Sequence, residues 1–298
     1  MSVKSADTLS DVSDHFNGNI EQPCSLHYDY KLINKLTYNH WDCLSACQIE
    51  SKFILLKKAK FTNYNLPNNA LDHDYSLDFA KPFLYDIGAM AYEYRQRLSM
   101  HPGQYNQIGA VSEDIFQKTI LELRCHADIL DIIEEDLDFD ENKGIICIHG
   151  GGVYGDKDKT IERWCSNFRR LPENVRNRIA IENCEKCYSV QDCLKISKKL
   201  NIPVIFDIHH YECYNMLHPS EDILPLKKVI KKVFKTWHKR GLKPYCHISE
   251  QGKGKTGHHS DYISKIPDCF LNAGREFTLD VEAKMKENAI FKLVNYHK

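Results

Sequence analysis

The sequence predicts an α/β fold, a (β/α)8 TIM-type barrel of parallel strands with a metal site at the C-terminal face. Three observations favour it. Short apolar strands alternate with helical segments of ten or more residues, which implies parallel strands joined by crossover helices. The length of 298 residues accommodates the roughly 250 residues of such a barrel. A histidine or a carboxylate stands at the end of one expected strand after another. An open doubly wound sheet is the alternative architecture.

The expected strands are short apolar runs. The segment 145–148 reads IICI and is followed by three glycines, and the segment 203–208 reads PVIFDI. Continuous apolar strands of this kind are typical of parallel sheets, which are covered on both faces. The expected strands are 53–56, 97–100, 145–148, 178–182, 203–208, 245–248 and 277–281.

The expected helices show apolar residues at a spacing of three or four. In the segment 112–135 these residues are Ile115, Ile120, Leu123, Ile129, Leu130 and Ile133. The segment 226–240 is basic and amphipathic. The expected helices are 78–94, 112–135, 159–170, 189–200, 226–240 and 261–273.

Composition indicates an ordinary soluble globular protein, with 42% hydrophobic and 27% charged residues and a net charge of -1. We interpret residues 1–20 as a disordered leader and 21–298 as one barrel domain. The sequence has neither an apolar run that could span a bilayer nor a secretory signal. We therefore expect a monomeric intracellular protein that is not secreted and has no membrane or protein partner. Nucleus, cytoplasm and viral factory all stay open as compartments.

The 12 cysteines are expected to be reduced, because disulfides are rare inside cells. Cys184 and Cys187 form a C-x-x-C pair, and Cys43 and Cys47 lie four positions apart. Only one pair has knuckle spacing, so the sequence argues against a zinc knuckle. Most of the others are interpreted as small buried hydrophobes, among them Cys125, Cys147, Cys246 and Cys269.

The strand ends carry the chemistry. In a parallel barrel all C-terminal strand ends open onto one face, so residues far apart in sequence converge there. Histidines with carboxylates suit Zn²⁺, Mn²⁺ or Fe²⁺, and this set exceeds what one tetrahedral ion can use. Two or three divalent ions are implied, which suits the displacement of a phosphoryl group. The strand-end residues are His101, His149, Glu182, Asp207 with His209 and His210, His247 with Glu250, and Glu282.

A single histidine or glutamate near a strand end is more often a hydrogen-bonded structural group than a metal ligand. We favour that interpretation for Glu250, His209 and His218. For the six strand-end positions taken together it is weak, because ionisable groups are rarely buried unless paired or metal-bound. His73, in the segment LDHDY, stays open between the two.

Two loops suggest a nucleic-acid substrate. The loop after His101 reads HPGQYNQ, and its Pro and Gly favour a tight turn that exposes Gln104 and Tyr105. An exposed tyrosine beside an amide suits base stacking and edge hydrogen bonding, although packing of the tyrosine on the next helix is favoured on these residues alone. The loop 252–259 carries Lys253, Lys255 and His259 among glycines. It could bind phosphate, or it is a solvated flexible loop.

Seven segments in this order resemble the UV damage endonuclease family, over roughly residues 70–285. They are RLSMHPGQYNQ (97–107), IHGGGVYGDK (148–157), IENCE (181–185), FDIHH (206–210), CHISEQ (246–251), GHHSDYI (257–263) and DVEAK (280–284). The resemblance implies a barrel-shaped DNA repair nuclease. Such an enzyme nicks the phosphodiester backbone immediately 5′ of cyclobutane dimers and 6-4 photoproducts, and often of abasic sites, by metal-activated attack of water.

The resemblance also implies roles for particular residues. Gln104 and Tyr105 match the pair that the family inserts into the duplex, and Lys253, Lys255 and His259 are expected to contact DNA. Glu182, His149 and His247 are the expected catalytic residues. Mn²⁺ is the expected ion, with Mg²⁺, Zn²⁺ or Co²⁺ as alternatives. The implied metal ligands are His73, His101, His149, Glu182, Asp207, His210, His247 and Glu282.

Two departures from the family are visible. Tyr245 stands where some members have a chemically modified lysine that binds metal, so that ligand is either lost or replaced by water or Glu250. Residues 1–70 match the family poorly, and lesion preference can differ accordingly. Three rival functions stay open: an abasic-site endonuclease of a related barrel, a sugar isomerase-like barrel, and a damaged-DNA binder without catalysis.

Overall fold

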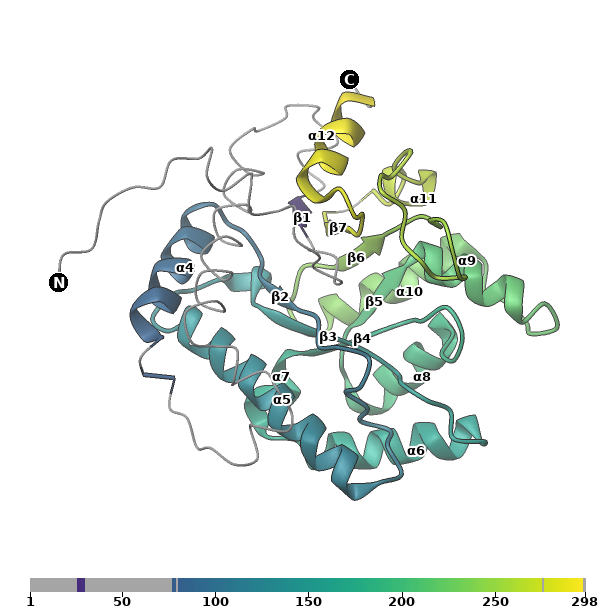
Figure 1. Ribbon diagram of the computed structural model, residues 1–298, viewed down its shortest axis with the longest axis horizontal. Helices are drawn as coiled ribbons and strands as arrows, with labels where there is room; N and C mark the ends of the chain where they lie inside the picture. The colour runs from purple at the N-terminus through teal and green to yellow at the C-terminus, as the bar shows by residue number, and fades with distance from the viewer. Residues whose placement is uncertain (1–25, 30–76, 79, 275, 297–298) are drawn as a thin grey trace.

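The computed structural model describes residues 26–29, 77–78, 80–274 and 276–296, and within them seven strands form one curved sheet (Figure 1). The strand order is β1-β7-β6-β5-β4-β3-β2. From β2 to β7 each strand pairs in parallel with the next one along the chain. The strands are β1 (Leu26–Asp29), β2 (Ser99–Met100), β3 (Ile145–His149), β4 (Ile179–Glu182), β5 (Val204–Asp207), β6 (Tyr245–Ile248) and β7 (Thr278–Val281).

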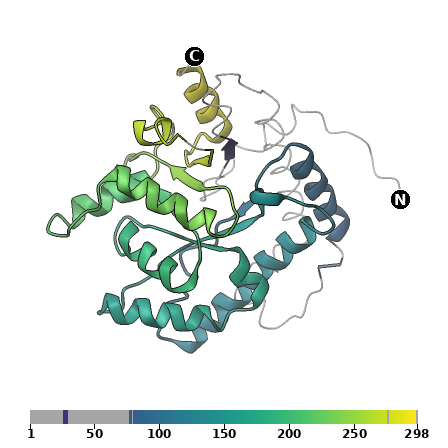
Figure 2. The ribbon, with the colours of Figure 1, turned by 180° about the vertical axis from the view of Figure 1, so that it is seen from behind.

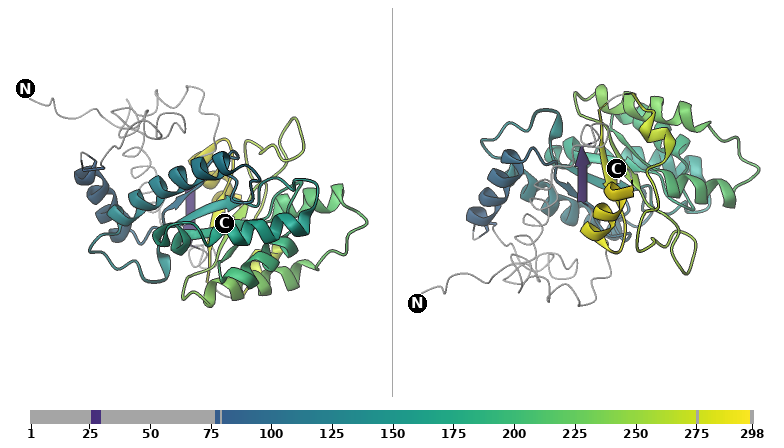
Figure 3. Two further views of the ribbon diagram at one scale, coloured as in Figure 1. Left: turned by 90° about the horizontal axis from the view of Figure 1, so that it is seen from below. Right: turned by 90° about the horizontal axis from the view of Figure 1, so that it is seen from above.

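The helices alternate with the strands and lie around them, as Figures 1 and 2 show for α5 to α8 and α10. The C-terminal helix contacts β7, near the edge where β1 pairs (Figure 3). None of the described helices is both long enough and apolar enough to cross a membrane. The α-helices are α4 (Lys81–Glu93), α5 (Glu113–Ile133), α6 (Lys157–Phe168), α7 (Glu173–Arg178), α8 (Val190–Leu200), α9 (Ile208–Leu217), α10 (Leu226–His238), α11 (Asp268–Leu271) and α12 (Lys286–Tyr296), and Asp140–Asn142 forms a 3-10 turn.

Side-chain caps begin several of these helices. The Ser112 hydroxyl accepts a hydrogen bond from the Ile115 amide at the start of α5. Ser189 and Asp192 form a reciprocal capping box at the start of α8. Each cap satisfies amide groups that have no partner within the helix and contributes about 0.5–2 kcal/mol. The helices therefore begin where the short polar residues stand in the sequence.

The prediction of a parallel α/β fold is confirmed, but the described residues do not make a complete barrel of eight parallel strands. They contain seven strands, and β1 runs antiparallel to β7. A crossover connection makes two consecutive strands parallel. β1 and β7 are not consecutive, so no single crossover fixes the direction in which they pair. The expected strand 53–56 and the expected leader 1–20 lie outside the described residues.

Three helices differ from the prediction. The expected helix over 261–273 shrinks to α11, because the amide of Ser264 donates to the Glu250 carboxylate instead of to a helical carbonyl. The short α7 was not predicted, since its sequence ENVRNR contains a single apolar residue. Helix α9 was not predicted either, because two of its buried residues are the histidines His209 and His210, which a search for apolar residues at helical spacing does not find.

The core lies between the strands and the surrounding helices. Trp164 on α6 and Trp237 on α10 are fully buried there, and the indole of Trp237 donates a hydrogen bond to the Val204 carbonyl at 2.7 Å. A second, smaller apolar cluster joins α4 to α5 and includes Ile87 and Ile133. This packing holds the strand ends in place, which the functional site requires.

We expect Gly88→Ala to lower the free energy of unfolding. A β-carbon at Gly88 would lie 2.0 Å from the Ile133 carbonyl oxygen, so α4 and α5 would have to move apart. Overpacking costs about 1–3 kcal/mol, whereas alanine gains about 1 kcal/mol of helix propensity over glycine. Chemical denaturation of both proteins measures the difference. A stabilised variant would show that the helices are not in this close contact.

Candidate metal centre

The sheet register brings strand-end residues level with residues of neighbouring strands, with a step of two residues between β4 and β5, where Glu182 pairs with Ile205. His149 on β3 pairs with Glu182 on β4, and Asp207 on β5 pairs with His247 on β6. His247 in turn pairs with Asp280 on β7. Since β2 to β7 are parallel, these residues lie at the C-terminal edge of the sheet, where barrels of this kind carry their active sites.

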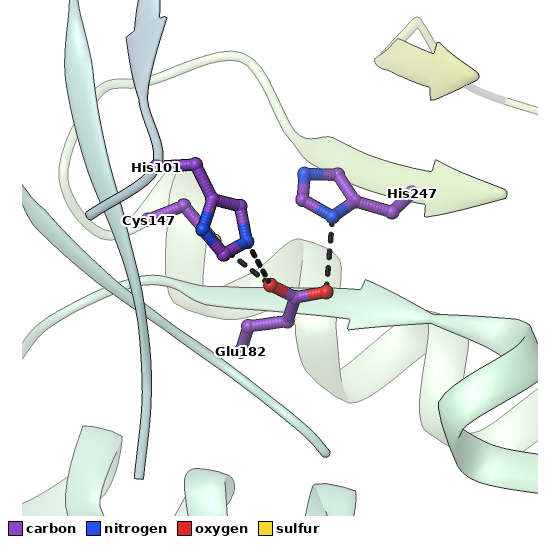
Figure 4. Close-up of side chains that lie close together, drawn as sticks. All are labelled: His101, Cys147, Glu182 and His247. Carbon is purple, nitrogen blue, oxygen red and sulfur yellow. Dashed lines mark hydrogen bonds and ion pairs between the residues drawn. The ribbon is translucent and has the colours of Figure 1, made fainter. Parts of the chain in front are cut away.

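Glu182 is the centre of the cluster and its side chain is fully buried. One carboxylate oxygen lies 3.2 Å from Nε2 of His101 and accepts the Cys147 thiol at 2.9 Å. The other oxygen lies 3.0 Å from Nδ1 of His247 (Figure 4). Nitrogens of His149 and His210 lie 3.6 Å and 3.5 Å from the same carboxylate. Four imidazoles and one thiol therefore converge on a single acid.

Two further carboxylates extend the cluster. Glu282 lies 3.1 Å from Nδ1 of His247 and 3.5 Å from Nε2 of His259. Asp207 has a structural role as well, because its carboxylate accepts the His210 amide at 2.8 Å and so begins helix α9. This cap turns the chain directly from strand into helix and brings His210 to face Glu182.

Three overlapping groups could each hold a metal ion, and within each the ligand atoms lie within 4.8 Å of one another. Every predicted ligand that falls in the described residues belongs to one of them, whereas His73 lies outside those residues. The groups are His101 with Cys147, Glu182 and His247; His149 with Glu182 and His210; and Asp207 with His247 and Glu282.

The carboxylates and imidazoles of the cluster shift one another's pKa values. Burial opposes ionisation of Glu182, but the imidazole of His247 and hydrogen bonds from His101 and His210 outweigh it and hold the pKa of Glu182 well below its usual range. Burial likewise opposes the charged form of His247, yet Glu182 and Glu282 raise the pKa of His247 well above its ordinary value. At His149 desolvation prevails and lowers the pKa to about 4. The centre favours a cation, and His149 stays neutral as a metal ligand must.

The donor set fits divalent metal ions. Imidazole nitrogens and carboxylate oxygens together are the donors of Zn²⁺, Mn²⁺ and Fe²⁺ sites. Nδ1 of His149 is buried and has no hydrogen-bond partner among the described residues. Buried carboxylates such as Glu182, Asp207 and Glu282 cost several kcal/mol each unless opposite charge compensates them. Bound cations would supply that compensation.

A second layer of side chains lies beneath the strand-end residues. The Tyr245 hydroxyl donates to the Asp280 carboxylate at 2.6 Å and lies 3.1 Å from the Ser99 hydroxyl. Tyr245 is therefore committed to a buried hydrogen-bond network. Glu250, considered as a substitute ligand, accepts hydrogen bonds from Ser264 and belongs to none of the three groups of potential ligands.

We expect Tyr245→Phe to lower the free energy of unfolding by about 1–3 kcal/mol, the cost of leaving a buried polar group without its donor. Burial raises the pKa of Asp280 to about 7, and Tyr245 donates to this carboxylate. The matched control is Tyr188→Phe, because the buried Tyr188 hydroxyl has no hydrogen-bond partner among the described residues. Denaturation of both variants measures the difference, and equal stabilities would contradict the role of this hydrogen bond.

The turn after His101 exposes the residues expected to meet DNA. The Asn106 amide donates to the Gly103 carbonyl at 3.0 Å and closes the turn. Gln104 is exposed, and 80% of the Tyr105 surface is accessible. Tyr105 therefore does not pack on the following helix. The interpretation that the loop sequence alone favoured, packing of the tyrosine on that helix, is wrong.

The three predicted DNA contacts in the loop 252–259 have different surroundings. Its backbone is held by a hydrogen bond from the Gly252 amide to the His258 carbonyl at 2.6 Å. Lys253 and Lys255 are exposed, whereas His259 is turned toward Glu282 at the border of the cluster. The two lysines thus lie in the solvent-facing part of the loop, whereas His259 lies beside the potential metal ligands.

Sequence reasoning missed Cys147 and Asp280. Cys147 was interpreted as a small core residue, and Asp280 was not considered. Both stand two positions before a strand-end residue, His149 and Glu282 respectively. Side chains two positions apart in a strand share a face, so this periodicity could have identified both.

Comparison with known proteins assigns the family. A sequence model described as UV-endonuclease UvdE matches residues 53–298. This chain belongs to the UvdE family. The predicted resemblance is confirmed.

Relatives within the UvdE family carry consistent names. A putative UV-damage endonuclease of Acanthamoeba polyphaga mimivirus is 38% identical over 229 residues, covering 74% of this chain and 66% of the relative. The UV-damage endonuclease of Schizosaccharomyces pombe is 33% identical over 231 residues, covering 74% of this chain and 37% of the relative. The chain thus spans about two thirds of the viral relative and little more than one third of the yeast one.

A solved structure supports the fold. The crystal structure of SacUVDE superposes with a TM-score of 0.66 at 29% identity, covering 87% of this chain and 89% of that chain. The curved sheet of parallel strands is therefore an architecture that this family member shares.

Proposed function

We propose that this protein is a metal-dependent endonuclease that nicks duplex DNA immediately 5′ of UV photoproducts, both cyclobutane dimers and 6-4 photoproducts, with abasic sites as a further substrate. The convergence of four histidines on the buried Glu182 carries the proposal. Relatives named UV-damage endonuclease support it.

The ligands in this proposal are His101, His149, Glu182, Asp207, His210, His247 and Glu282, together with His73 from outside the described residues. These residues would hold two or three divalent ions, with Mn²⁺ expected, and bound ions would supply an activated water and neutralise charge on the phosphate. Each oxygen of Glu182 lies beside a histidine, so this carboxylate would bind metal through either oxygen.

The accessible side chains set where a phosphate can approach. His101 and His149 are 34% and 28% exposed, whereas Glu182 beneath them is fully buried. A phosphate therefore reaches the cluster from the His101 side. Since Tyr105 follows four positions later in an exposed turn, it can contact the bases while the cluster holds the backbone.

The remaining contacts orient the DNA. Gln104 and Tyr105 insert at the lesion, where damage has already weakened stacking and lowers the unstacking cost of a few kcal/mol. Exposed Lys253 and Lys255 bind flanking phosphates as point charges. His259, the last residue of this loop and 3.5 Å from Glu282, faces the phosphate that is cut.

The test is a nicking assay with the full chain and Mn²⁺. Duplexes carrying a cyclobutane dimer, an abasic site or no damage are compared side by side. We expect a nick on the 5′ side of the dimer and an intact undamaged strand. Cleavage of the abasic duplex alone would favour an abasic-site endonuclease, and binding without any nick under Mn²⁺, Mg²⁺, Zn²⁺ or Co²⁺ would favour a non-catalytic binder.

A further inference from the structure

Cys147 differs from the other described cysteines in its surroundings. Its thiol donates to the Glu182 carboxylate at 2.9 Å, and the residue is 1% exposed. Among the nine described cysteines, it alone belongs to a group of potential metal ligands. The thiol therefore lies where a ligand would be, on the same side of the carboxylate as His101 (Figure 4).

The geometry of this group suits one ion. The ligand atoms of His101, Cys147, Glu182 and His247 lie within 4.8 Å of one another. Four donors on a tetrahedral zinc ion, at about 2.0–2.3 Å from the metal, lie about 3.3–3.8 Å apart. Small side-chain adjustments would close the difference. The four residues come from four different strands or their ends, so the sheet holds them in place.

We propose that Cys147 is a thiolate ligand of the metal centre and that, with His101, Glu182 and His247, it forms a position selective for Zn²⁺ over Mn²⁺. The inference rests on the proposed metal centre. Thiolate is a soft donor that favours Zn²⁺, whereas the two other groups offer only nitrogen and oxygen. The centre thus combines one thiophilic position with positions suited to Mn²⁺.

Binding at this position exchanges a proton for the ion. The thiol proton leaves to solvent, and the sulfur lone pair forms the bond to the metal. The Glu182 oxygen that accepted the thiol is released to bind metal as well. The buried position of Cys147 does not block entry, because His101, 34% exposed, lies at the solvent side of the same group.

The test uses Co²⁺ as a spectroscopic substitute for Zn²⁺. Metal-free full-length protein is titrated with Co²⁺, and absorption is recorded in the visible and near-ultraviolet regions. We expect visible d–d bands together with a near-ultraviolet band from thiolate-to-cobalt charge transfer. In Cys147→Ser the d–d bands remain and the charge-transfer band disappears. Zn²⁺ affinity falls by at least the roughly 10- to 100-fold that loss of a supporting group costs, while Mn²⁺ affinity changes less.

Two control variants attribute the band. Cys246→Ser changes a fully buried cysteine next to His247 that belongs to no ligand group. Cys187→Ser changes the half-buried cysteine of the C-x-x-C pair, whose pKa the neighbouring Cys184 lowers to about 6. Both should keep the charge-transfer band. Its loss in Cys187→Ser with retention in Cys147→Ser would overturn the inference.

The wild-type spectrum alone separates the possible failures, so the inference stays falsifiable even if a variant does not fold. Visible d–d bands without a charge-transfer band would refute the thiolate ligand and leave the proposed metal centre intact. No cobalt binding at all would refute both. The full set of expected spectra would support both.

Discussion

Glu182→Gln is expected to reduce nicking of UV-damaged DNA by more than about 100-fold. Loss of a group that only supports a metal ligand costs about 10- to 100-fold in metal affinity or activity, and Glu182 lies among the ligands themselves. Glu182 contacts four histidines and one thiol and belongs to two of the three ligand groups. The amide is neutral and would hold cations less tightly than the carboxylate, so metal binding should weaken together with nicking.

The matched control for this variant is Glu250→Gln. Glu250 also follows a strand, but its carboxylate accepts hydrogen bonds from Ser264, which an amide oxygen can accept as well. We expect it to retain metal and activity. Nicking rates and metal content are measured for both variants. If Glu182→Gln nicked damaged DNA at the normal rate, the cluster would not be the active site.

Tyr105→Ala is expected to weaken binding of damaged DNA by about 5- to 150-fold. Stacking of a base on an aromatic ring contributes about 1–3 kcal/mol, and about 1.4 kcal/mol corresponds to a factor of ten in affinity. With 80% of its surface exposed, Tyr105 has little packing to lose. The melting temperature and the metal content should therefore stay unchanged.

Two further variants separate stacking from other effects. Tyr105→Phe keeps the ring and should bind nearly as well as the original protein. Phe83→Ala removes another exposed aromatic ring, 57% accessible on α4, and should have no effect. Equilibrium binding to damaged and undamaged duplexes is measured at one salt concentration. An equal loss for both duplexes would assign Tyr105 to backbone contact rather than to the lesion.

Much of the fold followed from local patterns. Strands such as 145–148 were predicted because a short apolar run bounded by glycine is typical of a buried strand. Helix α9 could not be predicted in this way. It exists because Asp207 caps it, and the buried residues His209 and His210 face the cluster rather than an apolar core.

The sequence by itself determined which residues stand at the strand ends and, through the parallel alternation, that they meet at one edge. Only the tertiary structure decided which of them share a carboxylate, because those distances depend on sheet register and on side-chain reach across strands. That is why Cys147 and Glu182, 35 positions apart, form a 2.9 Å contact that strand periodicity alone does not specify. The curvature of the sheet brings potential ligands from several strands together around Glu182.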